Sequence, residues 1–267
     1  MPYDGNNLTL QIKNYKLVIR NMERLVIIPT YNEKENIEAI ITAVMNLPLA
    51  FEVLVIDDGS PDGTADIVKG LMAGKYAGRV HLVERQGKLG LGTAYIAGFK
   101  WAIEHKAEYI FEMDADFSHN PQDLLKLYDS CANEGADLAI GSRYVTGVNV
   151  VNWPMGRVLM SYYASAYVRI VTGMNVRDTT AGFVCYNRRV LQAIRLDEVE
   201  FKGYAFQIEM KFTAYRLGFK IKEVPIIFVN RVLGSSKMNT SIFGEAFFGV
   251  IKLKLRSIFG KIHRNVQ

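Results

Sequence analysis

The sequence predicts an α/β fold with a mostly parallel central sheet and helices on both of its faces. Short apolar runs, typical of buried strands, alternate along the chain with amphipathic stretches that are typical of helices. Such an alternation builds right-handed strand–helix–strand units around a parallel sheet. The chain has 267 residues, of which 49% are hydrophobic and 22% charged, so it can bury a core of this size.

Most of the strands are expected in the first half of the chain. The first, 24–29, is short and apolar, and Pro29 is expected to stop it because proline cannot donate to a sheet ladder. A helix follows, because Ile37, Ile40 and Val44 recur at helical spacing after an acidic first turn. Further strands are expected at 51–58, 79–84, 107–116 and 136–144, and helices at 60–72, around Trp101 and at 121–133.

The second half is richer in aromatic residues. An apolar stretch from 150 to 173 contains Arg157 and Arg169, and it is followed by an expected strand at 181–187, a helix at 204–218 and a strand at 220–231. From 241 onwards, apolar and basic residues are interleaved at helical spacing. The expected parts are an N-terminal extension (1–21), one domain (22–240) and an amphipathic, basic C-terminal tail (241–267).

Charge and cysteine content narrow the class of protein. The net charge of +5 fits anionic ligands or a membrane surface better than nucleic acid, and no basic run with interleaved aromatic residues occurs. The two cysteines, Cys131 and Cys185, form no CxxC pair, which favours a reducing compartment. No apolar run reaches the roughly 18–20 residues that a membrane-spanning helix needs.

Polar side chains follow four of the expected strands. Tyr31 and Glu33 follow the first, Asp58 ends the second, Asp114 and Asp116 end the fourth, and Arg143 ends the fifth. Ligands of parallel sheets bind beyond the carboxyl ends of the strands. This edge is therefore the predicted binding site.

The block "MDADFS" predicts a metal site. In an extended segment, residues two apart point the same way, so Asp114 and Asp116 can face one ligand together. Two adjacent carboxylates repel unless a cation or proton lies between them, and oxygen ligands suit Mg²⁺ or Mn²⁺. The alternative is a solvated acidic loop or a helix cap, since aspartate-rich turns are common.

The nucleotide is expected at the ends of the first two strands. The carboxylate of Asp58 can accept hydrogen bonds from a base or a ribose, Tyr31 can stack on a base, and Glu33 can contact a base or sugar. The alternatives are that Asp62 and Thr64 cap a helix and that Glu33 only complements a helix dipole. The loop "GKLGLG" matches neither phosphate-binding glycine pattern and is expected to be a flexible loop near the site.

Basic residues downstream can neutralise phosphate. They are Arg143, Arg157, Arg231 and Lys237. The four histidines have no metal-ligand spacing, and no Ser/His/Asp arrangement stands out, so hydrolase and zinc chemistry are not expected.

Together, several blocks resemble the dolichol- or polyprenol-phosphate mannosyltransferases of glycosyltransferase family 2, which have a GT-A (Rossmann-like) fold. The resemblance covers about 22–240, and "PTYNE" alone is typical only of the wider family. The blocks, in chain order, are "IPTYNEKENI", "VIDDGSPDGTAD", "GLGTAYIAGF", "MDADFSHNP", "GSRYVTG" and "NRVLGSSK".

The resemblance implies roles for individual residues. Asp116 would be the principal ligand of Mg²⁺ or Mn²⁺, with Asp114, and Ser118 stands where some members have a further glutamine ligand. Arg143 is expected to act in catalysis with Asp116. The nucleotide would be held by Pro29, Tyr31, Glu33, Ile56 and Asp58. The diphosphate would lie beside Asp114, Ala115 and Asp116, and Arg231 and Lys237 would bind it. The acceptor phosphate would lie near Arg143, Arg157 and Ser161.

The resemblance also implies an activity: transfer of mannose from GDP-mannose to a polyprenyl monophosphate, with inversion. The expected location is the cytoplasmic face of a membrane, where the tail and the stretch from Trp153 to Ile170 would contact lipid. A helper membrane subunit stays open as a further partner. Alternatively, the tail packs on the core. Two other functions stay open: transfer of glucose from UDP-glucose, and a non-catalytic nucleotide-sugar-binding scaffold.

Overall fold

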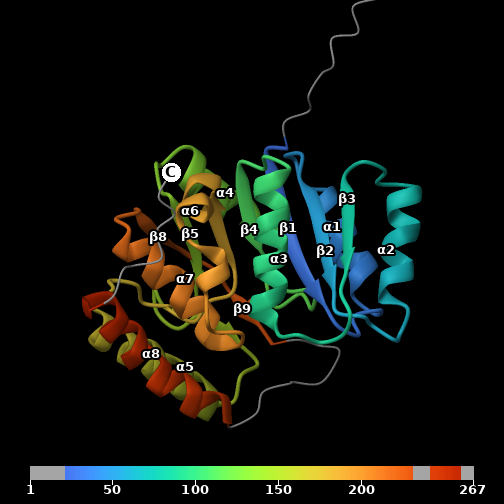
Figure 1. Ribbon diagram of the computed structural model, residues 1–267. Helices are drawn as coiled ribbons and strands as arrows, with labels where there is room; N and C mark the ends of the chain where they lie inside the picture. The colour runs from blue at the N-terminus through green and yellow to red at the C-terminus, as the bar shows by residue number, and fades with distance from the viewer. Residues whose placement is uncertain (1–21, 231–240, 260–267) are drawn as a thin grey trace, which may run out of the picture.

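A computed structural model describes residues 22–230 and 241–259. The strands of the main sheet are β1 (Arg24–Thr30), β2 (Glu52–Asp57), β3 (Val80–Glu84), β4 (Tyr109–Glu112), β5 (Leu138–Ser142), β7 (Val184–Asn187) and β8 (Ile221–Pro225). They lie in the order β3-β2-β1-β4-β7-β5-β8 (Figure 1). All neighbours pair in parallel except β7, which is antiparallel to β4 and β5. The predicted mostly parallel α/β sheet is confirmed.

Helices cover both faces of this sheet (Figure 1). On one face lie α1 (Ile37–Met45), α2 (Thr64–Ala73) and α4 (Asp123–Ala132). On the other lie α3 (Leu91–Glu104), α6 (Arg188–Ala193) and α7 (Tyr204–Arg216), with α5 (Met155–Thr172) and α8 (Ser241–Phe259) packed beyond them. A short 3₁₀ helix spans Leu196–Glu198.

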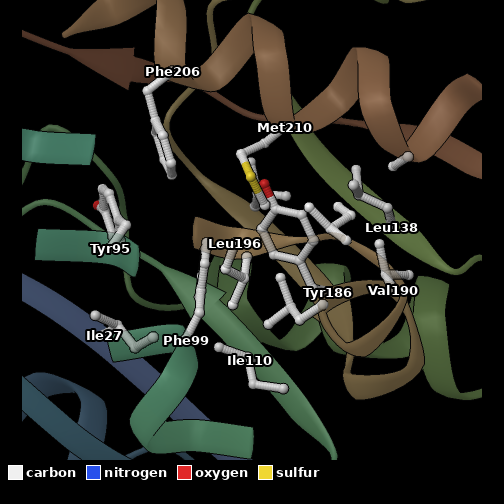
Figure 2. Close-up of a cluster of buried hydrophobic side chains, with 14 of the residues drawn as sticks. Ile27, Tyr95, Phe99, Ile110, Leu138, Tyr186, Val190, Leu196, Phe206 and Met210 are labelled. Atoms are coloured by element: carbon white, nitrogen blue, oxygen red, sulfur yellow. The ribbon is translucent and has the colours of Figure 1, made fainter. Parts of the chain in front are cut away.

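Each face has its own hydrophobic cluster, because the strands are buried on both sides. Figure 2 shows part of the cluster under α3 and α7, where the Phe99 ring lies 5.3 Å from Tyr186 and 6.4 Å from Phe206. Full burial of side chains of this kind contributes about 1.5–3 kcal/mol each. Helix α3 approaches β1 closely at Gly98, where a Cβ atom would meet Ile27 at 2.7 Å.

Several predicted strand ends differ from the structure, and the first strand and the strand predicted at 220–231 are two examples. β1 continues through Pro29 to Thr30, and it can do so because β4 pairs only with Arg24–Ile27, so that β1 is an edge strand beyond that point. The strand predicted at 220–231 is two strands. β8 ends at Pro225, and β9 (Phe228–Val229) pairs with β6 (Val150–Val151) in a separate two-stranded sheet.

The C-terminal helix has two different faces. Val250 and Leu253 of α8 are buried in the cluster shared with α7, whereas Phe248, Leu255 and Ile258 are exposed. Helix α8, the described part of the tail, therefore packs on the core through one face, as one of the sequence alternatives proposed. In the described residues, no helix combines the length and the apolar character that crossing a membrane requires.

Candidate active site

The polar side chains predicted at the strand ends do share one edge of the sheet. β1, β2 and β4 are parallel, and β4 and β5 run in the same direction because β7 is antiparallel to both. β1 lies between β2 and β4, so the chain order reverses beside it. Such a switch point is where parallel sheets bind ligands. Tyr31, Asp58 and Asp114 follow the three strands at this point.

Asp114 and Asp116 lie in a loop rather than in the strand. β4 ends at Glu112, so the argument from an extended segment is wrong, and we call 114–119 the acidic loop. The side chain of Asp114 is 40% exposed, whereas Asp116 is buried. The Asp116 carboxylate accepts the backbone N–H of Ser118 at 3.0 Å. The loop turns one carboxylate towards solvent and uses the other partly to hold its own shape.

The donor set of this loop fits Mg²⁺ or Mn²⁺. It offers the carboxylate oxygens of Asp114 and Asp116, and Ser118 contributes a hydroxyl to the same loop. Among the described residues, no cluster of three or more His, Cys, Asp or Glu side chains could enclose an ion. An ion held by two carboxylates would complete its coordination with water and substrate oxygens, as Mg²⁺ commonly does.

His119 ends the acidic loop and was passed over in the sequence. Its ring is buried, stacks on Phe183 with centroids 4.7 Å apart, and meets Phe228 edge-on at 5.5 Å. Its Nδ1 atom accepts the backbone N–H of Asp114 at 3.2 Å. Burial lowers the pKa of His119 to about 4, although the Asp116 carboxylate opposes this, so the ring is neutral at neutral pH.

Asp58 binds an arginine that the sequence analysis did not single out. The Nε atom of Arg85 donates to the Asp58 carboxylate at 2.7 Å, and Nη1 donates to Thr93 at 2.9 Å. Arg85 directly follows β3 and precedes the loop "GKLGLG". This position at the end of a strand could have marked Arg85 as a site residue in the sequence. The turns after β2 and β3 touch here, since a Cβ on Gly59 would lie 3.1 Å from the Gly87 nitrogen.

The other residues predicted to contact the nucleotide differ in their exposure and in their neighbours. The Lys88 ammonium lies 5.2 Å from the centre of the Tyr31 ring, so the loop "GKLGLG" does reach this site, as predicted. Glu33 accepts a hydrogen bond from Asn36 at 3.1 Å. Pro29 is half-buried within β1, whereas Ile56 and Ala115 are buried, which leaves the Ile56 side chain in the core and only its main chain for a ligand.

The helix-cap alternative is partly right for Asp62. Its carboxylate accepts the N–H of Thr64 at 3.0 Å and the N–H of Lys34 at 3.0 Å. The Thr64 hydroxyl in turn accepts the N–H of Glu33 at 3.1 Å. These bonds tie the turn before α2 to the turn after β1.

Arg143 is held by a carboxylate that was not predicted. Its Nε and Nη2 atoms donate to Asp178 at 2.7 and 2.6 Å, and its backbone N–H donates to the same carboxylate at 2.9 Å. Burial raises the pKa of Asp178, but Arg143 outweighs it, and the pKa of this carboxyl lies below its ordinary value. Asp178 lies in the irregular segment before β7, which carries no sequence pattern that marks it.

Aromatic rings connect Arg143 to the other predicted acceptor residues. The Trp153 ring lies 5.4 Å from the Arg143 guanidinium and 4.1 Å from that of Arg157. Arg157 also donates to the Asn230 side chain at 3.3 Å. Ser161 is half-buried on α5, and its hydrogen bond to Tyr144 lowers the pKa of that phenol, although burial raises it overall. Arg231 and Lys237 lie outside the described residues.

A buried polar network lies directly behind the acidic loop. The Lys211 ammonium on α7 donates to the carbonyl of Ala181 at 2.6 Å and to the Gln207 side chain at 3.1 Å, and Gln207 donates to Glu112. Burial lowers the pKa of Lys211 to about 8 and raises that of Glu112 to about 7, and each charge opposes the shift of the other. The network joins α7 to the end of β4.

Residues 25–195 match the family model described as Glycosyl transferase family 2. The chain belongs to glycosyltransferase family 2.

Two curated members are similar over most of their length. The polyprenol monophosphomannose synthase of Mycolicibacterium smegmatis is 47% identical over 87% of each chain. The undecaprenyl-phosphate mannosyltransferase of Micrococcus luteus is 46% identical over 86% of this chain and 93% of its own. The family resemblance predicted from the sequence blocks is confirmed.

A solved structure of another glycosyl-transferring synthase has a similar fold. The glucosyl-3-phosphoglycerate synthase of Mycobacterium tuberculosis, in a crystal structure with Mn²⁺, UDP and glucosyl-3-phosphoglycerate, superposes with a TM-score of 0.62. The match covers 90% of this chain and 81% of that one, at 21% identity. At this identity the likeness concerns the fold alone, and it confirms the predicted GT-A-like architecture.

Proposed function

We propose that this family 2 enzyme transfers mannose from GDP-mannose to a polyprenyl monophosphate, with inversion at the anomeric carbon. The observation that carries the proposal is the acidic loop at the switch point, next to the Asp58 site, in a chain 47% identical to a polyprenol monophosphomannose synthase. The wider fold similarity to a synthase crystallised with Mn²⁺ and UDP supports a nucleotide-sugar donor and a divalent ion.

The donor is proposed to lie across the ends of β1, β2 and β4. Tyr31, Glu33 and Asp58 would bind the nucleoside, with the main chain at Pro29 and Ile56 beside it. Asp114 and Asp116, with Ser118, would hold Mg²⁺ or Mn²⁺, which when bound neutralises charge on the diphosphate leaving group. Arg231 and Lys237 would supply further positive charge to the diphosphate.

The acceptor phosphate is proposed to lie near Arg143, Arg157 and Ser161. In the reaction a phosphate oxygen of the lipid forms a bond to the anomeric carbon of mannose, while the bond from that carbon to the diphosphate breaks and GDP leaves. A phosphate monoester is already anionic at neutral pH, so no side chain has to remove a proton from the nucleophile. The buried, neutral His119 is consistent with this.

Arg143 would contribute chiefly by position and by hydrogen bonding. Its charge is balanced by Asp178, so the pair adds little net charge to the acceptor site. The Asp178 carboxylate holds both the backbone and the side chain of Arg143. A guanidinium fixed in this way loses little conformational entropy when it binds a ligand.

The enzyme is proposed to bind peripherally to the cytoplasmic face of a membrane through α5 and α8. These helices lie side by side at one end of the molecule (Figure 1). Large apolar side chains are exposed on both, including Tyr163 at 64%, Ile170 at 83% and Phe248 at 71%. Exposed apolar surface of this extent is typical of interaction sites, and a lipid acceptor calls for a lipid-facing surface. A helper membrane subunit could use the same surface.

The test offers labelled GDP-mannose and labelled UDP-glucose separately, with a polyprenyl phosphate and Mn²⁺. We expect the mannose label to become extractable into organic solvent, and to remain in water when the lipid phosphate is omitted. Transfer of the glucose label instead would replace the proposed donor. Binding of either nucleotide sugar without transfer would favour a non-catalytic scaffold.

A further inference from the structure

His119 connects the acidic loop to two other parts of the site. It closes the loop by accepting the Asp114 N–H at Nδ1, while its ring packs on Phe183, just before β7, and on Phe228 in β9. Next to it, the Ser118 carbonyl accepts the N–H of Val229 in β9 at 3.3 Å. The loop is therefore fixed to β9 by both a ring contact and a main-chain hydrogen bond.

The hydrogen bond at Nδ1 determines the state of the ring. A nitrogen that accepts a backbone N–H carries no proton, so the proton of a neutral ring must lie on Nε2. This contact fixes the backbone of Asp114, and the bond from the Ser118 N–H fixes the carboxylate of Asp116. Without the Nδ1 acceptor, the N–H of Asp114 would have to find another partner or stay unsatisfied, which is costly near a buried loop.

We propose that His119 is a positioning residue for the transfer reaction. Its Nδ1 atom holds the backbone of Asp114, and thereby presents the Asp114 and Asp116 carboxylates to the ion and the donor diphosphate. This rests on the proposed function. It assigns to His119 a role through Asp114, without contact to the substrate. The same ring ties the acidic loop to β9, and β9 leads to Asn230, which accepts the hydrogen bond from Arg157.

Two substitutions separate the hydrogen bond from the packing. His119→Asn places an oxygen at about the position of Nδ1 and removes most of the ring. His119→Phe keeps a ring that can stack on Phe183 and removes the acceptor. If only packing matters, phenylalanine is the better replacement; if the hydrogen bond positions the loop, asparagine is. His119→Met, which is smaller than phenylalanine and has no strong acceptor, serves if the phenylalanine variant does not fold.

The first measurement needs no ligand. In the full-length protein without metal, hydrogen exchange of the Asp114 amide is followed by NMR. We expect it to stay protected in the wild type and in His119→Asn, and to exchange about tenfold faster or more in His119→Phe or His119→Met. The thermal midpoint, measured alongside, identifies a general loss of stability. Equal protection in all variants would overturn the proposal.

The second measurement is the affinity for Mn²⁺ in the presence of GDP, from the electron paramagnetic resonance signal of the free ion. Loss of a contact that orients metal ligands weakens binding by about 10- to 100-fold. We expect this loss in His119→Phe, and we expect His119→Asn to stay close to the wild type. The reverse ranking would show that ring packing, and not the Nδ1 atom, supports the loop.

The two measurements keep this inference separate from the proposed function. If the wild type shows no mannosyl transfer, the proposed function fails, while the exchange of the Asp114 amide still decides whether His119 holds the loop. If transfer occurs and His119→Phe retains wild-type exchange and Mn²⁺ affinity, the proposed function stands and the role of His119 is rejected.

Discussion

At the scale of single residues, the site depends on buried carboxylates that have different partners. Asp116 caps the backbone of its own loop, Asp58 pairs with Arg85, and Asp178 pairs with Arg143. A carboxylate already neutralised by arginine can orient a neighbour but attracts a cation poorly. Of the two carboxylates of the acidic loop, Asp114 is the one that solvent reaches more easily. This division of roles leads to two predictions.

The substitution Asp116→Asn should abolish transfer and leave the fold intact. It removes a negative charge but keeps an oxygen that can accept the Ser118 N–H. Loss of metal-assisted stabilisation of the leaving group should lower kcat about a thousandfold. The measurement is mannosyl transfer under saturating Mn²⁺, with circular dichroism for the fold. Asp66→Asn, the same change on an exposed part of α2, is the control; near-normal turnover of Asp116→Asn would reject the metal role.

The substitution Asp178→Ala should destabilise the protein and disorder the acceptor side. It leaves the buried Arg143 without its carboxylate, which should cost about 3–5 kcal/mol in the free energy of unfolding. Urea denaturation checks this. The double variant Asp178→Ala with Arg143→Met should recover part of the loss, because it removes both charges. If the double variant is less stable than the single one, the charges are not the cause.

The sequence predicted the aspartates of the site better than the residues that contact them. Asp58, Asp114 and Asp116 follow apolar strands in compact blocks, so they were predicted. Arg85 and Asp178 lie in irregular segments and become neighbours of the site only through the tertiary fold. His119 was dismissed because it lacks metal-ligand spacing, yet its contact with Asp114 is made through the backbone, which no pattern of side chains reveals.

At the scale of elements, the strands and helices were predicted better than their ends and directions. Hydrophobic periodicity identified the helices over 37–45 and 123–132 and the strands that flank them. It did not show that 181–187 contains an antiparallel strand, since orientation is set by the neighbours that a strand finds. It also extended the fourth strand to Asp116, because a loop that follows a buried strand is equally compatible with the pattern.

The buried lysine of α7 gives a prediction about pH. Lys211 has a pKa of about 8 in the folded protein and 10.5 as the ordinary value, so between these values the unfolded state binds more protons. Raising the pH through this range therefore favours the folded state. The free energy of unfolding of the wild type, from urea titrations, should rise relative to that of Lys211→Met as the pH goes from 8 to 10.5.

A control for this effect is Lys34→Met, which removes an exposed lysine. Its stability should follow the wild-type pH dependence. At pH 7, where Lys211 is mostly charged, Lys211→Met should also be less stable than the wild type, because the buried Glu112 loses its partner. If the free energy of unfolding changed with pH in the same way in the wild type and in Lys211→Met, the lysine would titrate as it does in the unfolded chain.

At the scale of the whole molecule, the exposed apolar side chains of α5 and α8 mark the end that we propose to face lipid. The basic residues of α8 are not all available to lipid headgroups, since Lys252 and Arg256 pair with Glu200 and Lys254 donates to the Thr172 carbonyl. Membrane binding would therefore depend more on apolar contact than the basic composition of the tail suggests.

The double variant Ile170→Ser and Phe248→Ser should bind liposomes more weakly without unfolding. Each side chain is exposed, and burying one in lipid contributes up to about 1.5–3 kcal/mol, so affinity should fall at least tenfold. Co-sedimentation with anionic liposomes measures this. These point changes are preferable to removal of α8, because Val250 and Leu253 belong to the core.

The control for this experiment is Ile227→Ser, which removes an exposed isoleucine outside both helices. It should leave sedimentation unchanged. Equal weakening by the control would place the lipid contact elsewhere, and unchanged binding of the double variant would reject these helices as the contact.

The position of β7 has a consequence for how the protein is made. β4 and β5 precede it in the chain, but β7 lies between them in the sheet, so the two earlier strands are joined only through the later one. During synthesis, β5 therefore has no place beside the N-terminal strands until about forty residues after it have left the ribosome. Nascent chains arrested before that point should expose an unpaired strand edge and depend on chaperones.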